Sequence, residues 1–348
     1  MLQLNRSIFT VVIGIFVLSL GADCDPADNE PTGSAPSADT TTPPPDTVGN
    51  PDSVDNPDTE KPPVETGPVA VASAQEGQTA VPQTALHLQG DHSYADGALI
   101  STYEWSVAQP AGSTSVFLPT HTFPNPTFEA NVAGEYTFTL NVWDDTGQKS
   151  PQPMKFSVMV LPKDAIHVEL LWHTPGDPDE TDEGPEAGAD MDLHFVHQYA
   201  KSGPDLDNDG APDPWFDQPF DSFWFNPHPN WGNLDPTAND DPHLDRDDTD
   251  GAGPENLNMA EPEMGATYRI GAHYWHDHGY GGSLATVRIY ILQELVYEAA
   301  DVPMNSLDLW DVATIEWTEA GVIITPSTDK AGAPKISSNY QNPFFFQP

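Results

Sequence analysis

The stretch of this chain best suited to chemistry is an acidic run that turns at a glycine. From Asp205 a carboxylate recurs at every second position, and Gly210 follows the third of them. Oxygen ligands at alternating positions can surround one hard cation such as Ca²⁺, and glycine permits the sharp turn that closes such a loop. The run therefore predicts a cation site whose ligands are Asp205, Asp207, Asp209 and Asp213.

This run does not continue as an EF-hand. The twelfth position counted from Asp205 is Phe216, where an EF-hand places a bidentate Glu. Pro212 and Pro214 also oppose the helix that would have to follow. We expect a calcium loop of another kind, and the alternative interpretation is a solvated acidic surface loop.

A second set of candidate ligands combines a strand with a later turn. Along the predicted strand 190–195, alternation places Asp190, Asp192 and His194 on one face and apolar side chains on the other. The apolar face packs inward, which leaves the polar face free to hold a ligand. A turn further along the chain completes a composite cation site with Asp247, Asp248 and Asp250. The alternative is that Asp192 and His194 only cap loops by hydrogen bonding.

Histidines further along the chain raise the question of zinc, which binds imidazole and carboxylate ligands in a tetrahedral arrangement. His273, His276 and His278 stand close together in the sequence, but on a strand His273 points away from His276. The three converge only if the chain bends before Gly279, so zinc is not the expected ion. His273, His276 and Glu255 are additional candidate ligands for the cation.

Standard catalytic motifs are absent from the sequence. It contains no His-Glu-X-X-His, no Gly-X-Ser-X-Gly and no phosphate-binding glycine loop. We therefore expect a protein without catalysis. The rival interpretation is a secreted metal-dependent hydrolase, acting on polysaccharide or protein, that uses the Asp and His residues named above.

Three tryptophans follow the acidic run, namely Trp215, Trp224 and Trp231. Their ordinary use is a small core that folds the long segment between two predicted strands. Because Asp and Asn residues are interleaved with them, they could instead form an aromatic platform with polar rims, as in a carbohydrate-binding module.

The charge of the chain limits its partners. The 54 acidic and 11 basic residues give a formal net charge of -43, and such a chain repels nucleic acid and anionic membrane surfaces, which are bound by basic patches. Between residues 164 and 250 the only Lys and Arg are Lys201 and Arg246, so divalent cations are the expected neutraliser outside a cell. We expect the partner to be a cell-surface protein or a polysaccharide, and contact with a membrane only through a lipid anchor.

The N-terminus predicts export. An apolar run from Ile8 to Leu20 follows Arg6, which is typical of a signal peptide over residues 1–23. The only cysteine, Cys24, stands where a bacterial lipoprotein carries its lipidated residue. The N-terminus thus resembles that of a bacterial lipoprotein of the outer membrane or cell surface; the alternative is a secreted protein. Residues 24–65 are rich in Pro, Thr and Asp and predict a disordered tether.

Residues 66–162 predict a β-sandwich of roughly immunoglobulin size, because short segments with period-two alternation are separated by turn residues. This part resembles a PKD domain at Tyr103-Glu104-Trp105, at Gly134-Glu135-Tyr136 and at Trp143-Asp144-Asp145-Thr146-Gly147. The resemblance implies a spacer or interaction module on an extracellular protein, with no chemistry of its own.

Residues 163–325 predict a second β-sandwich that carries a long acidic, Trp-containing insertion. This part resembles the YfaP-type domain of bacterial extracytoplasmic proteins at Asp190-Met191-Asp192-Leu193-His194, from Leu244 to Asn256 and from Gly265 to Tyr274. The resemblance implies an extracytoplasmic β-sandwich and leaves its activity open. Residues 326–348 form a polar tail that ends in Phe344-Phe345-Phe346 and that either docks on a domain or frays.

The sequence thus predicts an all-β chain of two sandwich domains in tandem behind a disordered tether. Its expected function is that of an extracytoplasmic, lipid-anchored, calcium-stabilised binding or adhesion protein.

Overall fold

The computed structural model describes residues 67–182, 184, 187–206, 210–249 and 251–345. The predicted signal peptide, the tether and Cys24 lie outside these residues, as do Asp207, Asp209 and Asp250. Predictions that depend on them stay predictions. The part of the chain that the structure describes contains no helix long and apolar enough to cross a membrane.

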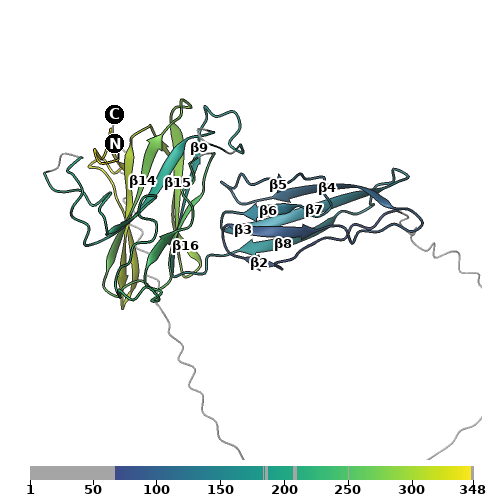
Figure 1. The fold of residues 1–348 in the computed structure, drawn as a ribbon, viewed down its shortest axis with the longest axis horizontal. Helices are drawn as coiled ribbons and strands as arrows, with labels where there is room; N and C mark the ends of the chain where they lie inside the picture. The colour runs from purple at the N-terminus through teal and green to yellow at the C-terminus, as the bar shows by residue number, and fades with distance from the viewer. Residues whose placement is uncertain (1–66, 183, 185–186, 207–209, 250, 346–348) are drawn as a thin grey trace, which may run out of the picture. The chain divides into compact units, whose positions relative to one another are not determined.

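The described residues form two sandwich-like units built from four β-sheets, which confirms the all-β prediction (Figure 1). The first sandwich pairs a sheet of strand order β1-β3-β6-β5 with a sheet of order β2-β8-β7-β4. Its strands are β1 (Ser73–Ala74), β2 (Thr79–Ala80), β3 (Thr84–Gln89), β4 (Ile100–Ala108), β5 (Phe117–Leu118), β6 (Thr127–Ala130), β7 (Gly134–Asp144) and β8 (Met154–Val160). Neighbouring strands are antiparallel except β2 and β8, which are parallel.

Strict alternation along β7 builds the core of the first sandwich. Tyr136, Phe138, Leu140 and Val142 are fully buried, and the residues between them are half-buried. Trp105 on β4 lies in the same core, and its indole Nε1 donates a hydrogen bond to the carbonyl of Phe123 at 3.1 Å. A buried indole N–H is therefore satisfied, so Trp105 serves the core.

The turn after β7 is held by one carboxylate. Asp144 accepts hydrogen bonds from the backbone N–H groups of Thr146 and Gln148 at 3.0 and 2.9 Å, and Gly147 takes a left-handed φ of 86°. The hydroxyl of Thr146 also donates to this carboxylate and, as the largest cause, holds the pKa of Asp144 below its usual value. The Asp-Asp-Thr-Gly sequence is thus a turn sequence.

The second sandwich comprises β9 to β19. One sheet has the order β11-β10-β14-β17-β18, with β19 also paired to β17, and the other has the order β12-β13-β9-β15-β16. The strands are β9 (Ile166–His173), β10 (Asp190–His197), β11 (Asp221–Ser222), β12 (Pro242–Leu244), β13 (Glu255–Met259), β14 (Thr267–His276), β15 (Ser283–Ile291), β16 (Glu294–Met304), β17 (Leu309–Thr318), β18 (Gly321–Pro326) and β19 (Lys335–Ser337).

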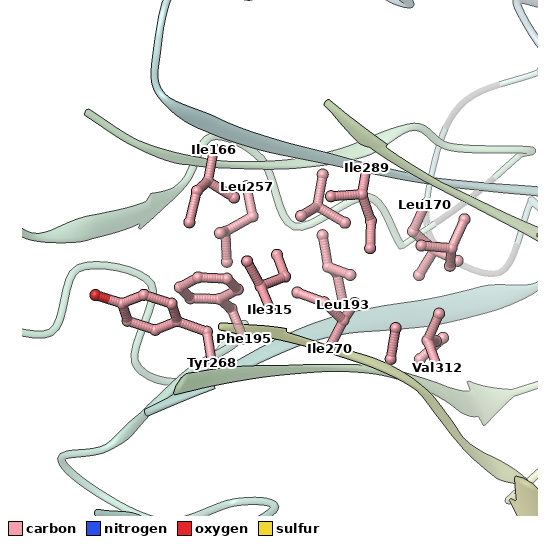
Figure 2. Packing of buried hydrophobic residues seen from close by; sticks show 14 of the residues in the cluster. Ile166, Leu170, Leu193, Phe195, Leu257, Tyr268, Ile270, Ile289, Val312 and Ile315 are labelled. Carbon is pink, nitrogen blue, oxygen red and sulfur yellow. The ribbon is translucent and has the colours of Figure 1, made fainter. Parts of the chain in front are cut away.

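The main core of the second sandwich lies between its two sheets. Figure 2 shows aliphatic side chains such as Ile166 and Leu170 of β9 facing Leu193 of β10 and Ile270 of β14. These strands alternate as their sequences predict, because one face of each strand must be apolar to enter this layer.

The opposite face of β10 is not open to solvent. Alternation leads us to expect Asp192 and His194 on a free polar face, yet every residue of β10 is buried. A second apolar cluster covers this face; it contains Val196, Ala200, Trp215, Phe216, Phe223, Leu309 and Tyr340, and we call it the aromatic layer. Residues of the acidic insertion and of the C-terminal tail therefore bury a strand face that the sequence marks as polar.

Candidate metal centre

Three carboxylates converge at one end of the second sandwich. One oxygen each from Asp192, Asp247 and Glu255 lies within 4.8 Å of the others. Asp192 is on β10, Glu255 begins β13, and Asp247 belongs to the turn between β12 and β13. Asp192 and Glu255 are buried, whereas Asp247 is exposed at the rim. The strand and the turn singled out in the sequence therefore do meet, and Glu255 joins them.

Backbone donors orient Glu255. Its Oε2 accepts a hydrogen bond from the N–H of Leu193 at 2.6 Å, and its Oε1 accepts one from the N–H of Asp248 at 3.2 Å. The short strand β11 pairs only with Phe195 and Val196, so it does not extend to the edge of β10 at Leu193. Glu255 thus links one sheet of the sandwich to the other.

Repulsion within the cluster is strong. Burial above all, and then the charges of Asp247 and Asp221, raise the pKa of Asp192 to about 8, against the opposing effect of His194. Burial and the charges of Asp192, Asp247 and Asp190 raise the pKa of Glu255 well above its usual value. Asp247 is exposed as a residue, but partial desolvation of its carboxyl raises its pKa as well. The three groups cannot all ionise near neutral pH without a compensating positive charge.

One oxygen of Asp192 lacks a partner among the described residues. Its Oδ2 is buried without a hydrogen bond, and Nδ1 of His273 stands 3.7 Å away. The Nε2 of His273 hydrogen-bonds to the carbonyl of Tyr340 at 2.9 Å and so carries the proton of the neutral ring. Burial lowers the pKa of His273 to about 3, which keeps the ring neutral at physiological pH. A buried carboxylate oxygen without a partner is costly and indicates a cation or a proton at this place.

We expect the second sandwich, in EDTA, to lose stability as the pH rises from about 4 to about 8. The unfolded chain releases the proton of Asp192 near 3.8, whereas the folded chain holds it to about 8. The stabilisation from that bound proton is fully present below the unfolded pKa and is lost as the pH rises through the folded pKa. Asp192→Asn stays neutral and should flatten the slope. Urea unfolding between pH 5 and 9 measures this, and equal slopes for both proteins would contradict the electrostatic account.

Other predicted ligands flank the cluster. Asp190 is buried and acts on the pKa of Glu255, and Asp248 contributes its backbone N–H. His194 is elsewhere: its Nδ1 hydrogen-bonds to Asp221 Oδ2 at 2.7 Å within the aromatic layer, where its ring stacks on Phe223 with centroids 5.2 Å apart. The structure therefore pairs His194 with a carboxylate rather than placing it with the cluster.

Two residues of this layer escape sequence reasoning. Asp221 accepts hydrogen bonds from His194 and from the N–H of Phe216, and Tyr340 contacts both His273 and Asp213. For Asp221 the available signal is an acidic residue between Phe220 and Phe223, since a carboxylate among aromatic residues is unusual unless it is paired. For Tyr340 the sequence offers no signal.

The other histidines do not form one set. His273 is fully buried, whereas His276 is exposed and its ring stands 4.4 Å from that of His278 between centroids. The Nδ1 of His278 hydrogen-bonds to the carbonyl of Gly188 at 2.7 Å. This arrangement agrees with the expectation that zinc does not bind these three residues together.

The acidic run that opens the insertion is described only in part. Asp205 Oδ2 accepts a hydrogen bond from the N–H of Gly210 at 3.0 Å, and Gly210 has a φ of 92°. Asp213 is buried, and its Oδ2 accepts hydrogen bonds from the N–H of Leu206 and from the hydroxyl of Tyr340, both at 2.7 Å. A calcium ion in this loop stays a prediction, because Asp207 and Asp209 lie outside the described residues.

The tryptophans of the insertion occupy two layers. Trp231 packs in the main core and donates from Nε1 to the carbonyl of Pro219 at 2.7 Å. Trp215 lies in the aromatic layer against Gly271, where an added Cβ would stand 2.5 Å from its ring. Only Trp224 is half-exposed, beside Phe225 and Phe345. This placement is that of a core rather than of one continuous ligand platform.

The fold and site define a protein of tandem β-sandwiches, the second of which holds a buried acidic cluster. Residues 74–158 match a family model that is described as a PKD domain, so the first sandwich contains a PKD domain. The similarity of residues 163–325 to YfaP-type domains stays a prediction. No curated protein matches the chain.

Two solved structures show a distant likeness. One comes from work titled "Structural basis for the promiscuous specificity of the carbohydrate-binding modules from the beta-sandwich super family"; it is 13% identical, covers 68% of this chain and 100% of its own, and has a TM-score of 0.24. The FN1-FN3 domains of chicken CNTN1 are 9% identical, cover 75% of this chain and 100% of their own, and have a TM-score of 0.21. At such TM-scores neither likeness supports a conclusion about this protein.

Proposed function

We propose that this chain is an extracytoplasmic binding or adhesion protein without catalysis, and that Ca²⁺ stabilises its second sandwich. The observation that carries the proposal is the Asp192, Asp247 and Glu255 cluster, in which buried carboxylates raise one another's pKa values. The PKD domain supports the location, since such domains are typical of extracellular and cell-surface proteins.

Calcium suits this cluster better than other common ions. Ca²⁺ binds six to eight oxygens at about 2.3–2.6 Å, so ligands on opposite sides of the ion stand roughly 4.8 Å apart. The three oxygens of the cluster fall within 4.8 Å of one another and thus fit one coordination sphere. Asp192, Asp247 and Glu255 would hold the ion through carboxylate oxygens alone, which is the donor set that calcium prefers.

A bound ion would fasten the two sheets of the second sandwich. Asp192 lies on the sheet that contains β10 and Glu255 on the sheet that contains β13, so one ion between them removes the repulsion and joins both layers. A rigid sandwich is suited to presenting a surface to a partner, for which we propose a cell-surface protein or a polysaccharide. The buried positions of His273 and Trp215 support binding over a hydrolase or a Trp-based sugar site.

We expect millimolar Ca²⁺ to raise the Tm of the second sandwich relative to EDTA. Ligand at 100 times its Kd stabilises by about 2.7 kcal/mol, which for a domain of this size shifts the Tm by roughly 5–10 °C. Asp192→Asn and Glu255→Gln should abolish the shift. Matched controls at exposed acids, Asp301→Asn and Glu319→Gln, should keep it. A scanning calorimetry trace that is the same in Ca²⁺ and in EDTA would refute the calcium proposal.

The binding half of the proposal has its own test. Beads coated with the full chain should adhere to cells or to polysaccharide-coated surfaces in Ca²⁺ and detach in EDTA, and Asp192→Asn beads should adhere less. Adhesion to neither surface at any Ca²⁺ concentration would count against a binding protein even if the Tm shift is observed.

A further inference from the structure

We propose a second metal site at the edge strand β12, one that takes a transition-metal dication of the Zn²⁺ class through two imidazoles and two carboxylates. Its ligands are Asp164, His228, His243 and Asp245. The site is separate from the acidic cluster. Glu255 shares its face of β13 with Leu257, which enters the main core, whereas His243 is paired in register with Asn258 on the opposite face of this sheet.

The distances around His243 are those of neighbouring metal ligands. Its Nε2 lies 3.4 Å from Asp245 Oδ1 and 4.0 Å from Asp164 Oδ2. Ligand atoms bound tetrahedrally at about 2.0–2.2 Å from a zinc ion stand roughly 3.3–3.6 Å from one another. The ring of His228 completes the group, with its centroid 6.4 Å from that of His243 and the planes inclined by 34°. The ring of His228 is partly exposed, so a rotation of its side chain can bring a nitrogen to the same ion.

The surroundings orient these ligands in advance. Asp245 Oδ2 accepts a hydrogen bond from Asn258 Nδ2 at 2.6 Å, and Asn258 Oδ1 in turn hydrogen-bonds to His167 Nδ1 at 2.6 Å. The N–H of Leu244 donates to the carbonyl of Pro227 at 2.9 Å, which holds the segment of His228 against β12. Such hydrogen bonds to a ligating carboxylate are typical of metal sites, because they direct the remaining oxygen at the ion.

An independent observation indicates a ligand here. Asp164 is 8% exposed, and its Oδ2 is buried without a hydrogen-bond partner while it faces His243 Nε2. A buried carboxylate oxygen without a partner costs free energy unless a positive charge approaches it. Two nitrogens and two oxygens favour a borderline dication such as Zn²⁺ over Ca²⁺, which prefers oxygen ligands throughout.

The ion would act as a clip for the long insertion. Asp164 precedes β9, His243 and Asp245 belong to β12 and the residue after it, and His228 lies in the segment that returns from the aromatic layer. A bond from one ion to all three segments would hold this return against the sheet and would also cover an edge strand.

The test uses Co²⁺ as the probe, because its visible absorption distinguishes tetrahedral from octahedral coordination. We expect the full chain to bind one equivalent with tetrahedral bands, in the presence of excess Ca²⁺. His243→Ala and His228→Ala should each weaken binding at least tenfold. A double variant of the other adjacent histidines, His276→Ala with His278→Ala, is the matched control and should bind as the native chain does. Zn²⁺ should displace the Co²⁺.

Isosteric Asp164→Asn covers the case in which His243→Ala fails to fold, as judged by circular dichroism. It should also weaken Co²⁺ binding at least tenfold. Native affinity in Asp164→Asn, loss of binding in the His276 and His278 control, or no Co²⁺ binding by the native chain would each overturn the proposal and leave His243 as the partner of two carboxylates in an ion pair. Because Ca²⁺ is present throughout, these outcomes are independent of the calcium proposal.

Discussion

Replacing Tyr340 by Ala is expected to lower the free energy of unfolding of the second sandwich by about 3–5 kcal/mol, the range for truncating a large buried aromatic side chain. Tyr340 is 1% exposed in the aromatic layer. Its hydroxyl donates to Asp213 Oδ2 at 2.7 Å, and its carbonyl accepts from His273. The substitution removes the ring and one of the donors to Asp213. Urea unfolding of the full chain, followed by tryptophan fluorescence, measures the loss.

Two companions separate the sources of this loss. Tyr340→Phe keeps the ring and removes only the hydroxyl donor to buried Asp213, so it should cost about 1–3 kcal/mol. Phe344→Ala lies in the same tail but at a side chain that is 68% exposed, and it should change stability by less than about 0.5 kcal/mol. If Tyr340→Ala were as mild as Phe344→Ala, the tail would not be an integral part of the sandwich.

Replacing Asp221 by Ala should also cost about 3–5 kcal/mol, because breaking one side of a buried ion pair leaves the other group without compensation. Asp221 and His194 are both fully buried, and Asp221 Oδ2 also accepts the N–H of Phe216 at 2.6 Å. Burial, as the largest cause, raises the pKa of Asp221, so the carboxylate depends on these two donors. The same urea unfolding measurement applies.

Graded variants sharpen this second expectation. Asp221→Asn retains an oxygen that can accept the N–H of Phe216 but loses the charge, so its cost should fall between those of the native chain and Asp221→Ala. Glu319→Ala, at an exposed acid, should be near neutral. Equal stability of Asp221→Ala and Glu319→Ala would show that His194 does not need its partner.

Both expectations concern a layer that a two-sheet sandwich does not require. The aromatic layer draws Trp215, Phe216 and Phe223 from the insertion and Tyr340 from the tail, and it covers the polar face of β10. The tail, whose composition allows both docking and fraying, docks: β19 pairs with β17, and Phe345 contacts Trp224. Asp192 is thereby removed from water, which is the main cause of its raised pKa.

Local patterns in the sequence determined the strands and the faces of their side chains. Period-two alternation follows from strand geometry alone, so Leu193 could be assigned to the core and Asp192 to the other face before any tertiary contact was known. The same holds for the turn at Asp144 to Gly147, which is built from hydrogen bonds between near neighbours. The all-β class and the PKD domain rest on such local signals.

Only the tertiary structure decided which carboxylates meet and which are buried. Asp192 and Glu255 belong to different sheets, and Tyr340 reaches Asp213 across 127 positions. Alternation states which way a side chain points but not what packs over it, so a face that is polar in the sequence could be open or covered. Burial and proximity arise from long-range packing, and these two quantities set the pKa of Asp192 and make its carboxylate a candidate cation ligand.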